Sequence, residues 1–224
     1  MQRVVRIRPA GGRGSRRVIA LADGRRFLLD AEEIPRLGVI EGAVVDGALL
    51  ERLATMDERV RAREAALTLL RYRLRSRAEL TGRLRRRSFT ADAIRDVIAD
   101  LTTQGLIDDA HFARVWAETR LAAGRSGPHR VRAELRGKGV PPPLIEEAVR
   151  TAFGARGEAE LAATVAERHL RRMRGLPVEV RLRRLAGLLR RRGFSGSAIA
   201  PLLRRQARES LTLDQSGISP IDDD

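Results

Sequence analysis

Apolar residues recur at helical spacing over most of this chain, and one larger pattern of them occurs three times. Each copy runs from a leucine through three basic or glycine residues, a serine or glycine and an apolar residue to an isoleucine five positions further on. The copies are Leu84–Ile94, Leu135–Ile145 and Leu189–Ile199, and they lie 51 and 54 residues apart. This spacing indicates that one structural unit of about fifty residues is used three times.

The periodicity within each copy predicts three helices. In the first copy, the apolar residues from Ile94 to Leu101 fall at i, i+3, i+4 and i+7, which places them on one face of a helix. We therefore predict a mainly α fold, a tandem array of three three-helix repeats of helix-turn-helix type, over residues 55–106, 107–154 and 155–208. A unit of three short helices buries little surface alone, so each repeat is expected to pack on its neighbour. Helices with defined bounds are predicted at 57–73, 77–87, 128–138, 143–153, 157–173, 178–192 and 197–208.

Short polar motifs predict where helices of the first repeat begin. The segments Thr55 to Glu58 and Ser76 to Glu79 have the Ser/Thr-x-x-Glu spacing of a capping box, in which two side chains satisfy free backbone amides. They predict that the first two helices begin just after them. Thr90 is the predicted N-cap of the third helix.

Other residues predict helix ends and one irregularity. Ser195 aligns with Thr90 as a helix cap, but a helix starting there would contain Pro201. We therefore expect the last helix to begin later, near Ser197, or to bend. A left-handed residue commonly closes a helix, and three residues hold this place after the middle helices: Ser88, Gly139 and Gly193.

Residues 1–50 have the pattern of strands. Residues 18–21 and 27–29 are short apolar runs on either side of an Asp-Gly step, which supplies the positive φ of a tight hairpin turn. Residues 4–7 and 42–45 are candidates for two further strands. A small N-terminal β-hairpin region is therefore predicted.

Positive charge is concentrated in the third repeat. The net charge is +15, and 44 residues are Lys or Arg, of which Lys138 is the single lysine. Residues 155–208 hold fourteen arginines and four acidic residues, too few for internal neutralisation. Such a block attracts polyanions, either a phosphate backbone or an acidic protein surface. Residues 209–224 are acidic and are predicted to be a disordered tail.

The sequence offers little catalytic or metal-binding chemistry. Its three histidines are isolated and cysteine is absent, so no metal site is predicted. Asp108 and Asp109 are better explained by a helix start than by acid–base catalysis. Trp116 follows Phe112 by four residues, which predicts a core position. We expect no enzyme activity and no cofactor.

Neither a nucleotide loop nor a membrane segment is predicted. The glycine-rich residues 11–15 lack the Gly-Lys-Ser/Thr ending of a phosphate-binding loop and are predicted to be a plain loop. No uncharged apolar run approaches the roughly 20 residues that cross a bilayer. We expect a cytoplasmic protein that does not bind membranes.

Three segments resemble the RecX family of regulatory proteins: RYRLRSRAEL at 71–80, GLIDDAHFA at 105–113 and GPHRVRAELRGKGV at 127–140. The resemblance covers roughly residues 60–205 and is most specific in the first two repeats. The N-terminal region is similar to an extension that only some members carry. The resemblance implies a protein that binds the RecA recombinase filament on single-stranded DNA and inhibits its ATPase, strand-exchange and coprotease activities, and so modulates DNA repair, homologous recombination and the SOS response.

Basic residues on the helices form the predicted contact surface. In the middle helix of the third repeat, Leu185 and Leu189 fall on one side and the arginines on the other. The expected partners are the RecA filament and single-stranded DNA, with duplex DNA as a further candidate, and the protein is expected to be a monomer. The predicted contact residues are Arg83, Arg85, Arg86, Arg130, Arg132, Arg136, Lys138, Arg183, Arg184, Arg190 and Arg191.

Two other functions stay open at this point. A stand-alone basic DNA-binding protein would use the repeats as helix-turn-helix readers and would bind duplex DNA without a recombinase. An adaptor for an acidic protein would not bind DNA at all.

Overall fold

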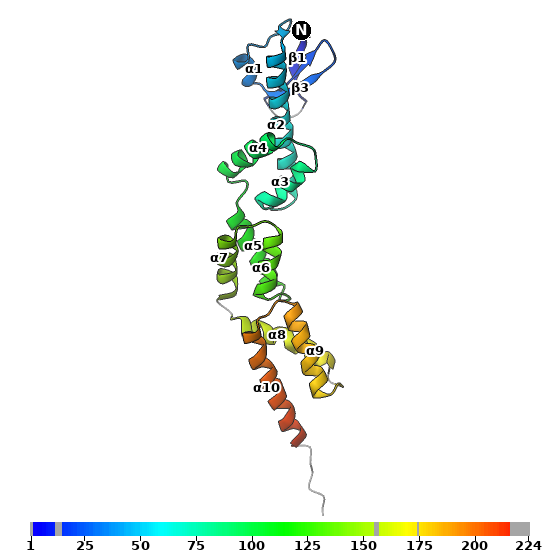
Figure 1. Cartoon of the computed structure of the whole chain (residues 1–224), viewed down its shortest axis with the longest axis vertical. Helices are drawn as coiled ribbons and strands as arrows, with labels where there is room; N and C mark the ends of the chain where they lie inside the picture. Colours follow the sequence, from blue (N-terminus) through cyan, green and yellow to red (C-terminus); the bar gives the residue numbers. More distant parts are fainter. Residues whose placement is uncertain (1, 12–14, 155–156, 174, 216–224) are drawn as a thin grey trace, which may run out of the picture. The chain divides into compact units, whose positions relative to one another are not determined.

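The computed structural model describes residues 2–11, 15–154, 157–173 and 175–215, with side chains described as far as residue 209 (Figure 1). The chain divides into two compact units, Met1–Asp108 and Asp109–Asp224. In the described residues, a small sheet and one three-helix group belong to the first unit, and two further three-helix groups belong to the second. The predicted fold class is confirmed.

A four-stranded antiparallel sheet, in the order β3-β2-β1-β4, begins the described part of the chain. The predicted hairpin joins β2 to β3, where Leu21 N donates to Arg25 O at 2.9 Å and Gly24 takes a φ of +87°. The strand predicted at 42–45 is shorter than expected, and residues 12–14 of the glycine-rich loop lie outside the described residues. The strands, and a short helix after them, are β1 (Gln2–Pro9), β2 (Arg16–Leu21), β3 (Arg26–Asp30), α1 (Glu33–Arg36) and β4 (Val44–Val45).

Helix α2 (Gly47–Tyr72) packs on the sheet and is also the first helix of the first repeat. Its N-cap is Asp46, whose Oδ1 accepts a hydrogen bond from Leu49 N at 2.7 Å. Leu53 is fully buried in the core beneath the sheet, whereas Ala62 is fully buried in the core of the first repeat. One continuous helix therefore serves two hydrophobic cores.

The predicted start of this helix, near residue 57, was wrong. Thr55 lies inside the helix, and its hydroxyl donates to Glu51 O at 2.9 Å instead of capping. Glu58 accepts hydrogen bonds from Thr90 N and Thr90 Oγ1, both at 2.7 Å. Glu58 of this motif thus caps the start of a different helix. Packing on the sheet extends α2 toward its N-terminus, past the predicted start.

Helices α3 (Arg77–Arg85) and α4 (Ala91–Thr103) complete the first repeat. The predicted caps are confirmed, since Ser76 Oγ accepts from Glu79 N at 3.1 Å and Thr90 Oγ1 accepts from Ala93 N at 3.3 Å. The core of this repeat includes Ala62, Ala66, Leu80, Leu84, Ile94, Val97 and Leu101.

The second repeat consists of α5 (Asp109–Ala122), α6 (Pro128–Gly137) and α7 (Pro142–Gly154). Its separate core includes Phe112, Ala117, Val131, Leu135, Ile145 and Val149. Trp116 is half-buried and packs against this core, with its ring centroid 5.9 Å from that of Phe112. Trp116 therefore contributes to the core as expected, but its side chain is only partly buried.

The third repeat consists of α8 (Glu158–Leu170), the 3₁₀ turn η1 (Arg171–Met173), α9 (Val178–Arg191) and α10 (Gly196–Gln215). Ser195 caps α10, because its Oγ accepts from Ala198 N at 3.2 Å. The helix begins at Gly196, one residue before the expected start near Ser197, and Pro201 lies inside it. Proline removes one helical hydrogen bond, and the cap together with burial of Ile199 offsets that loss.

Helix α10 also extends further than expected. It continues past Arg208 to Gln215, so the predicted disorder of 209–224 was wrong for residues 209–215. Arg205 Nε lies 2.7 Å from Glu209 Oε1, an i,i+4 pair that supports this part of the helix. Residues 216–224 lie outside the described residues.

The predicted left-handed closing residues are confirmed in all three repeats. The φ angles are +63° at Ser88, +70° at Gly139 and +81° at Gly193. Each is followed by an apolar residue that returns to the core of its repeat: Phe89, Val140 and Phe194.

Backbone contacts join the second and third repeats. Gly127 N donates to Arg192 O at 2.7 Å, and His129 N donates to Gly193 O at 3.0 Å. A Cβ atom placed on Gly193 would lie 2.3 Å from Arg130 N. The start of α6 therefore sits directly against the end of α9, at a separation that only glycine permits.

Candidate polyanion-binding surface

Helix α9 presents its arginines to solvent. Leu185 and Leu189 are fully buried in the core of the third repeat, and the helical period places residues 183, 184, 190 and 191 on the side away from that core. The predicted residues on its outer side are all exposed: Arg183, Arg184, Arg190 and Arg191. Within the described part of the chain, none of these four forms an ion pair with a carboxylate. Their charge is therefore available to a partner.

The predicted residues of the first repeat are likewise exposed. Arg83 and Arg85 lie in the last turn of α3, and Arg86 is the residue that follows it. Among the described residues, these three also form no ion pair with a carboxylate. Basic side chains at the C-terminal end of a helix interact favourably with its dipole, which accounts for part of their placement.

The predicted residues of the second repeat are engaged by their own chain. Arg130 Nε lies 3.2 Å from Glu134 Oε1, and Arg132 Nε lies 2.9 Å from Glu146 Oε2. Arg136 Nε donates to Arg132 O at 3.3 Å. The structure thus separates the predicted arginines into two groups. Those at α3 and α9 have no carboxylate partner among the described residues, whereas on α6 Arg130 and Arg132 are ion-paired and Arg136 bonds a backbone carbonyl.

Lys138 and Trp116 belong to a network centred on Glu134. The Lys138 ammonium lies 4.1 Å from the centroid of the Trp116 ring, and the Arg120 guanidinium lies 4.3 Å from it. Glu134 accepts hydrogen bonds from Trp116 Nε1 at 3.0 Å and Arg120 Nε at 2.6 Å. Burial alone would raise the pKa of Glu134, but the hydrogen bonds from Arg120, Trp116 and Arg130 lower it. This carboxylate therefore stays ionised and holds its cations in place.

The sequence reasoning missed a basic cavity in the second unit. Its volume is about 340 Å³. One of its arginines, Arg125, comes from the loop before α6, and its other charged residues belong to the third repeat. The charge excess of 155–208 was a signal for part of it, but no local pattern connects this region with Arg125. The residues that line this basic cavity are Gly124, Arg125, Arg168, His169, Arg172 and Arg192.

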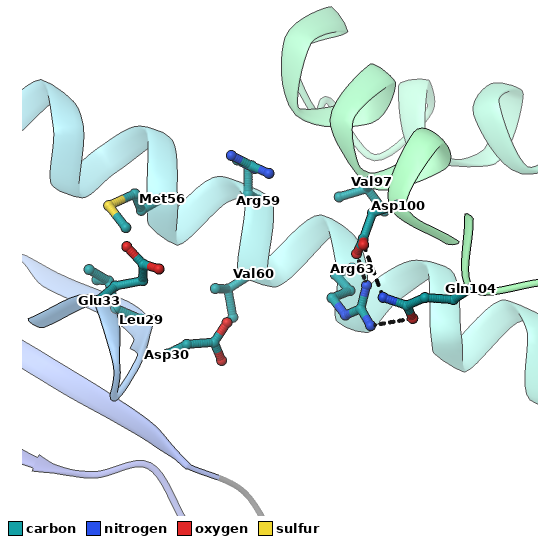
Figure 2. A pocket seen from close by; sticks show the side chains of 10 residues that line it. All are labelled: Leu29, Asp30, Glu33, Met56, Arg59, Val60, Arg63, Val97, Asp100 and Gln104. Carbon is teal, nitrogen blue, oxygen red and sulfur yellow. Dashed lines mark hydrogen bonds and ion pairs between the residues drawn. The ribbon is translucent and has the colours of Figure 1, made fainter. Parts of the chain in front are cut away.

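A second cavity, of about 390 Å³, lies in the first unit between the sheet and α4 (Figure 2). Arg63 points to Asp100 and Gln104, and hydrogen bonds join all three side chains. Asp30 and Glu33 add negative charge on the side of the sheet. Since its cations are paired and its remaining charge is acidic, this cavity does not suit an anion.

Other kinds of site lack support in the described residues. No group of three or more His, Cys, Asp or Glu side chains there is placed to hold a metal ion. In the same ranges, no helix combines the length and apolar character needed to span a membrane.

Comparison with known proteins gives consistent matches to one family. The model of the first three-helix domain of RecX matches residues 62–101, and that of the second three-helix domain matches residues 108–149. The regulatory protein RecX of Thermobifida fusca is 39% identical over 153 residues, which cover 68% of this chain and 82% of the relative. The regulatory protein RecX of Streptomyces coelicolor is 39% identical over 149 residues, 66% of this chain and 78% of that protein.

Two solved structures have a similar fold. A crystal structure of regulatory protein RecX has a TM-score of 0.73 at 24% identity and covers 88% of this chain and 97% of its own. That of RecX from Lactobacillus salivarius has a TM-score of 0.60 at 25% identity and covers 67% of this chain and 97% of its own. With a relative 39% identical and matched over 82% of its length, the sequence resemblance is confirmed, and the chain belongs to the RecX family of regulatory proteins.

Proposed function

We propose that this chain is a monomeric, cytoplasmic regulator that binds the RecA recombinase filament on single-stranded DNA. Binding inhibits the ATPase, strand-exchange and coprotease activities of the filament, and so modulates DNA repair and the SOS response. Membership of a family of regulatory proteins supports the regulatory part of this proposal. The role requires binding alone and assigns no catalytic group to the chain.

The observation that carries the proposal is the unpaired basic face of α9. Arg183 and Arg190 are seven residues apart, which is two helical turns or about 10 Å along the axis. The adjacent Arg184 and Arg191 repeat this spacing, so two pairs of guanidinium groups lie on one side of the helix. Because no carboxylate in the described residues neutralises them, a phosphate backbone or an acidic protein surface gains the full attraction.

The direct test is the ATPase rate of RecA on single-stranded DNA, titrated with this protein. The variant with Arg183→Gln, Arg184→Gln, Arg190→Gln and Arg191→Gln should need at least about tenfold more protein for half-inhibition, because four attractive charges are lost. Undiminished inhibition by this variant contradicts the assignment of α9.

A matched control removes the same charge from arginines that already have acidic partners. Arg25, Arg36, Arg95 and Arg150 are exposed and are paired with Asp23, Glu33, Asp92 and Glu147. Changing these four to Gln should leave the inhibition close to that of the wild type. An equal loss in both variants would mean that total charge matters and the α9 surface does not.

Gel shifts separate this proposal from the two alternatives. The proposal expects binding to RecA on single-stranded DNA to exceed binding to either DNA form alone. Strong, salt-sensitive binding to duplex DNA without RecA, together with no effect on its ATPase, would favour a stand-alone DNA-binding protein. No binding to DNA in any arm would favour an adaptor for an acidic protein.

A further inference from the structure

The basic cavity gathers cations from four separate segments of the second unit. Arg125 comes from the loop after α5, Arg168 from α8, Arg172 from η1 and Arg192 from the residue that follows α9. Within the described residues, none of these four arginines forms an ion pair with a carboxylate. The arrangement therefore places at least four positive charges around one space of about 340 Å³ with no internal counter-charge.

Helix dipoles account for only part of this clustering. Helices α5, α8 and α9 all end near the basic cavity, and the C-terminal end of a helix attracts cations. Each end carries roughly half a negative charge, so three ends cannot balance four guanidinium groups. A net positive field stays in the cavity.

Backbone hydrogen bonds fix the walls of the basic cavity before any ligand arrives. Gly127 N donates to Arg192 O at 2.7 Å, which ties the loop that holds Arg125 to the end of α9. Burial, followed by the charges of Arg125 and Arg130, lowers the pKa of Arg192. The chain thus holds mutually repelling cations together, an arrangement that a bound anion would stabilise.

His169 supplies a group that can change with the ligand. Arg192 Nη2 lies 3.0 Å from His169 Nε2, and since arginine can only donate, this nitrogen accepts and the imidazole is neutral. Burial, together with the charges of Arg192 and Arg172, lowers the pKa of His169. An anion among these residues would reverse that effect, because it favours the protonated imidazole.

We propose that the basic cavity is a phosphate-binding site, formed jointly by the second and third repeats, that takes the phosphate group of a nucleic-acid backbone or free inorganic phosphate. Arginine guanidinium groups match the planar face of phosphate oxygens and bind them through charge-assisted hydrogen bonds. The site goes beyond the proposed function, since it requires no recombinase.

Proton NMR of the imidazole resonances tests the proposal on the full chain. The chain has three histidines, and His111 lies on α5 and does not line the basic cavity, so it serves as the internal reference. Titration with inorganic phosphate should shift the His169 resonance saturably and raise its pKa, with a smaller change at His111. Equal, non-saturating shifts at both histidines, or no shift at His169, would overturn the proposal.

Two variants of equal charge sharpen this test. The variant with Arg125→Gln and Arg172→Gln removes two exposed arginines that line the cavity. It should need about tenfold more phosphate, or more still, for the half-maximal shift of His169. Arg150→Gln with Arg204→Gln removes two exposed arginines of the same unit that do not line the cavity, and the shift should persist. Circular dichroism checks that both variants stay helical. A shift that survives in the first variant would contradict the site.

A short oligothymidylate distinguishes the two sources of phosphate. If the site binds a backbone phosphate, the oligonucleotide should shift the His169 resonance at a lower concentration than inorganic phosphate does. If the site binds free phosphate, only the inorganic ion should shift this resonance. An effect of neither probe would sink the proposal. This test is independent of the test of the proposed function. Filament inhibition is measured with the α9 variant, whereas the phosphate-dependent shift of His169 is measured with the cavity variant, so either result can fail without the other.

Discussion

Each repeat closes its middle helix with a residue in the left-handed conformation, and the surroundings of these residues differ. At Gly139, a Cβ atom would meet nothing within 4 Å, whereas at Gly193 it would lie 2.6 Å from Arg130 Cβ. Ser88 takes the same backbone conformation with a side chain present, at φ +63°. Position in the repeat therefore determines the backbone conformation, and at Gly193 the contact with the second repeat also requires glycine.

The pair Gly139→Ala and Gly193→Ala separates these two effects. Gly139→Ala should cost about 1 kcal/mol of unfolding free energy, which is the cost of a side chain in the left-handed region. Gly193→Ala should cost about 2–4 kcal/mol, because overpacking against Arg130 adds to the same strain. Urea denaturation of the full chain measures both, and equal costs would show that the contact between the repeats yields without penalty.

His169 makes stability depend on pH in a defined direction. Its folded pKa is lowered, chiefly by burial, so the unfolded chain binds a proton more readily. Stability should therefore fall as the pH drops below about 6.5, and the His169→Gln variant should lose less over the same range. Urea midpoints in a phosphate-free buffer at about pH 7.5 and about pH 5.5 measure this. Parallel changes in the two proteins would contradict it.

At the scale of elements, helix starts in the first and third repeats share a double cap. Glu58 accepts from Thr90 N and Oγ1, and Glu158 accepts from Ser195 N at 2.5 Å and Oγ at 2.8 Å. In the second repeat Pro141 holds the matching sequence position, and proline has no N–H to satisfy. In the first and third repeats, a carboxylate from the first helix thus fixes the start of the last helix.

Replacing Glu158 tests the strength of this contact. Glu158→Ala should lower the unfolding free energy by about 1–3 kcal/mol, because two half-buried donors lose their acceptor. Glu160→Ala is the matched control, since Glu160 is an exposed carboxylate in the same first turn of α8. Both changes remove one charge from the helix N-terminus, so the difference between their urea midpoints isolates the cap. Equal midpoints would show that the cap is unimportant.

The helices differ in how far their own sequences predict them. The buried leucines and exposed arginines of α9 follow the helical period, and both faces could be predicted. The start of α2 was missed, although Asp46 is a local cap signal, because the capping-box spacing at Thr55 indicated a later start and only the packing of Leu53 with the sheet shows that the earlier turns are helical. The end of α10 was also missed, since Glu209 stabilises it through Arg205 although it begins an acidic segment.

At the scale of the whole molecule, each predicted repeat contains a hydrophobic cluster of its own, and charged groups lie around these clusters. The arginines of α6 show how packing between helices changes the charge of the candidate surface. Arg130 and Glu134 share one helix, so their pairing could be predicted, but Glu146 reaches Arg132 from α7. The number of arginines in a segment therefore overestimates the charge that it offers to a partner.

The sequence by itself determined the mainly helical fold, the threefold repetition and its left-handed closing residues, because these depend on spacings within about fifty residues. Tertiary structure alone decided which arginines stay unpaired and that four segments meet around the basic cavity. The physical reason is that charge neutralisation acts through space. A carboxylate fourteen residues away, as Glu146 is from Arg132, cancels a positive charge as well as a neighbour does once the helices pack.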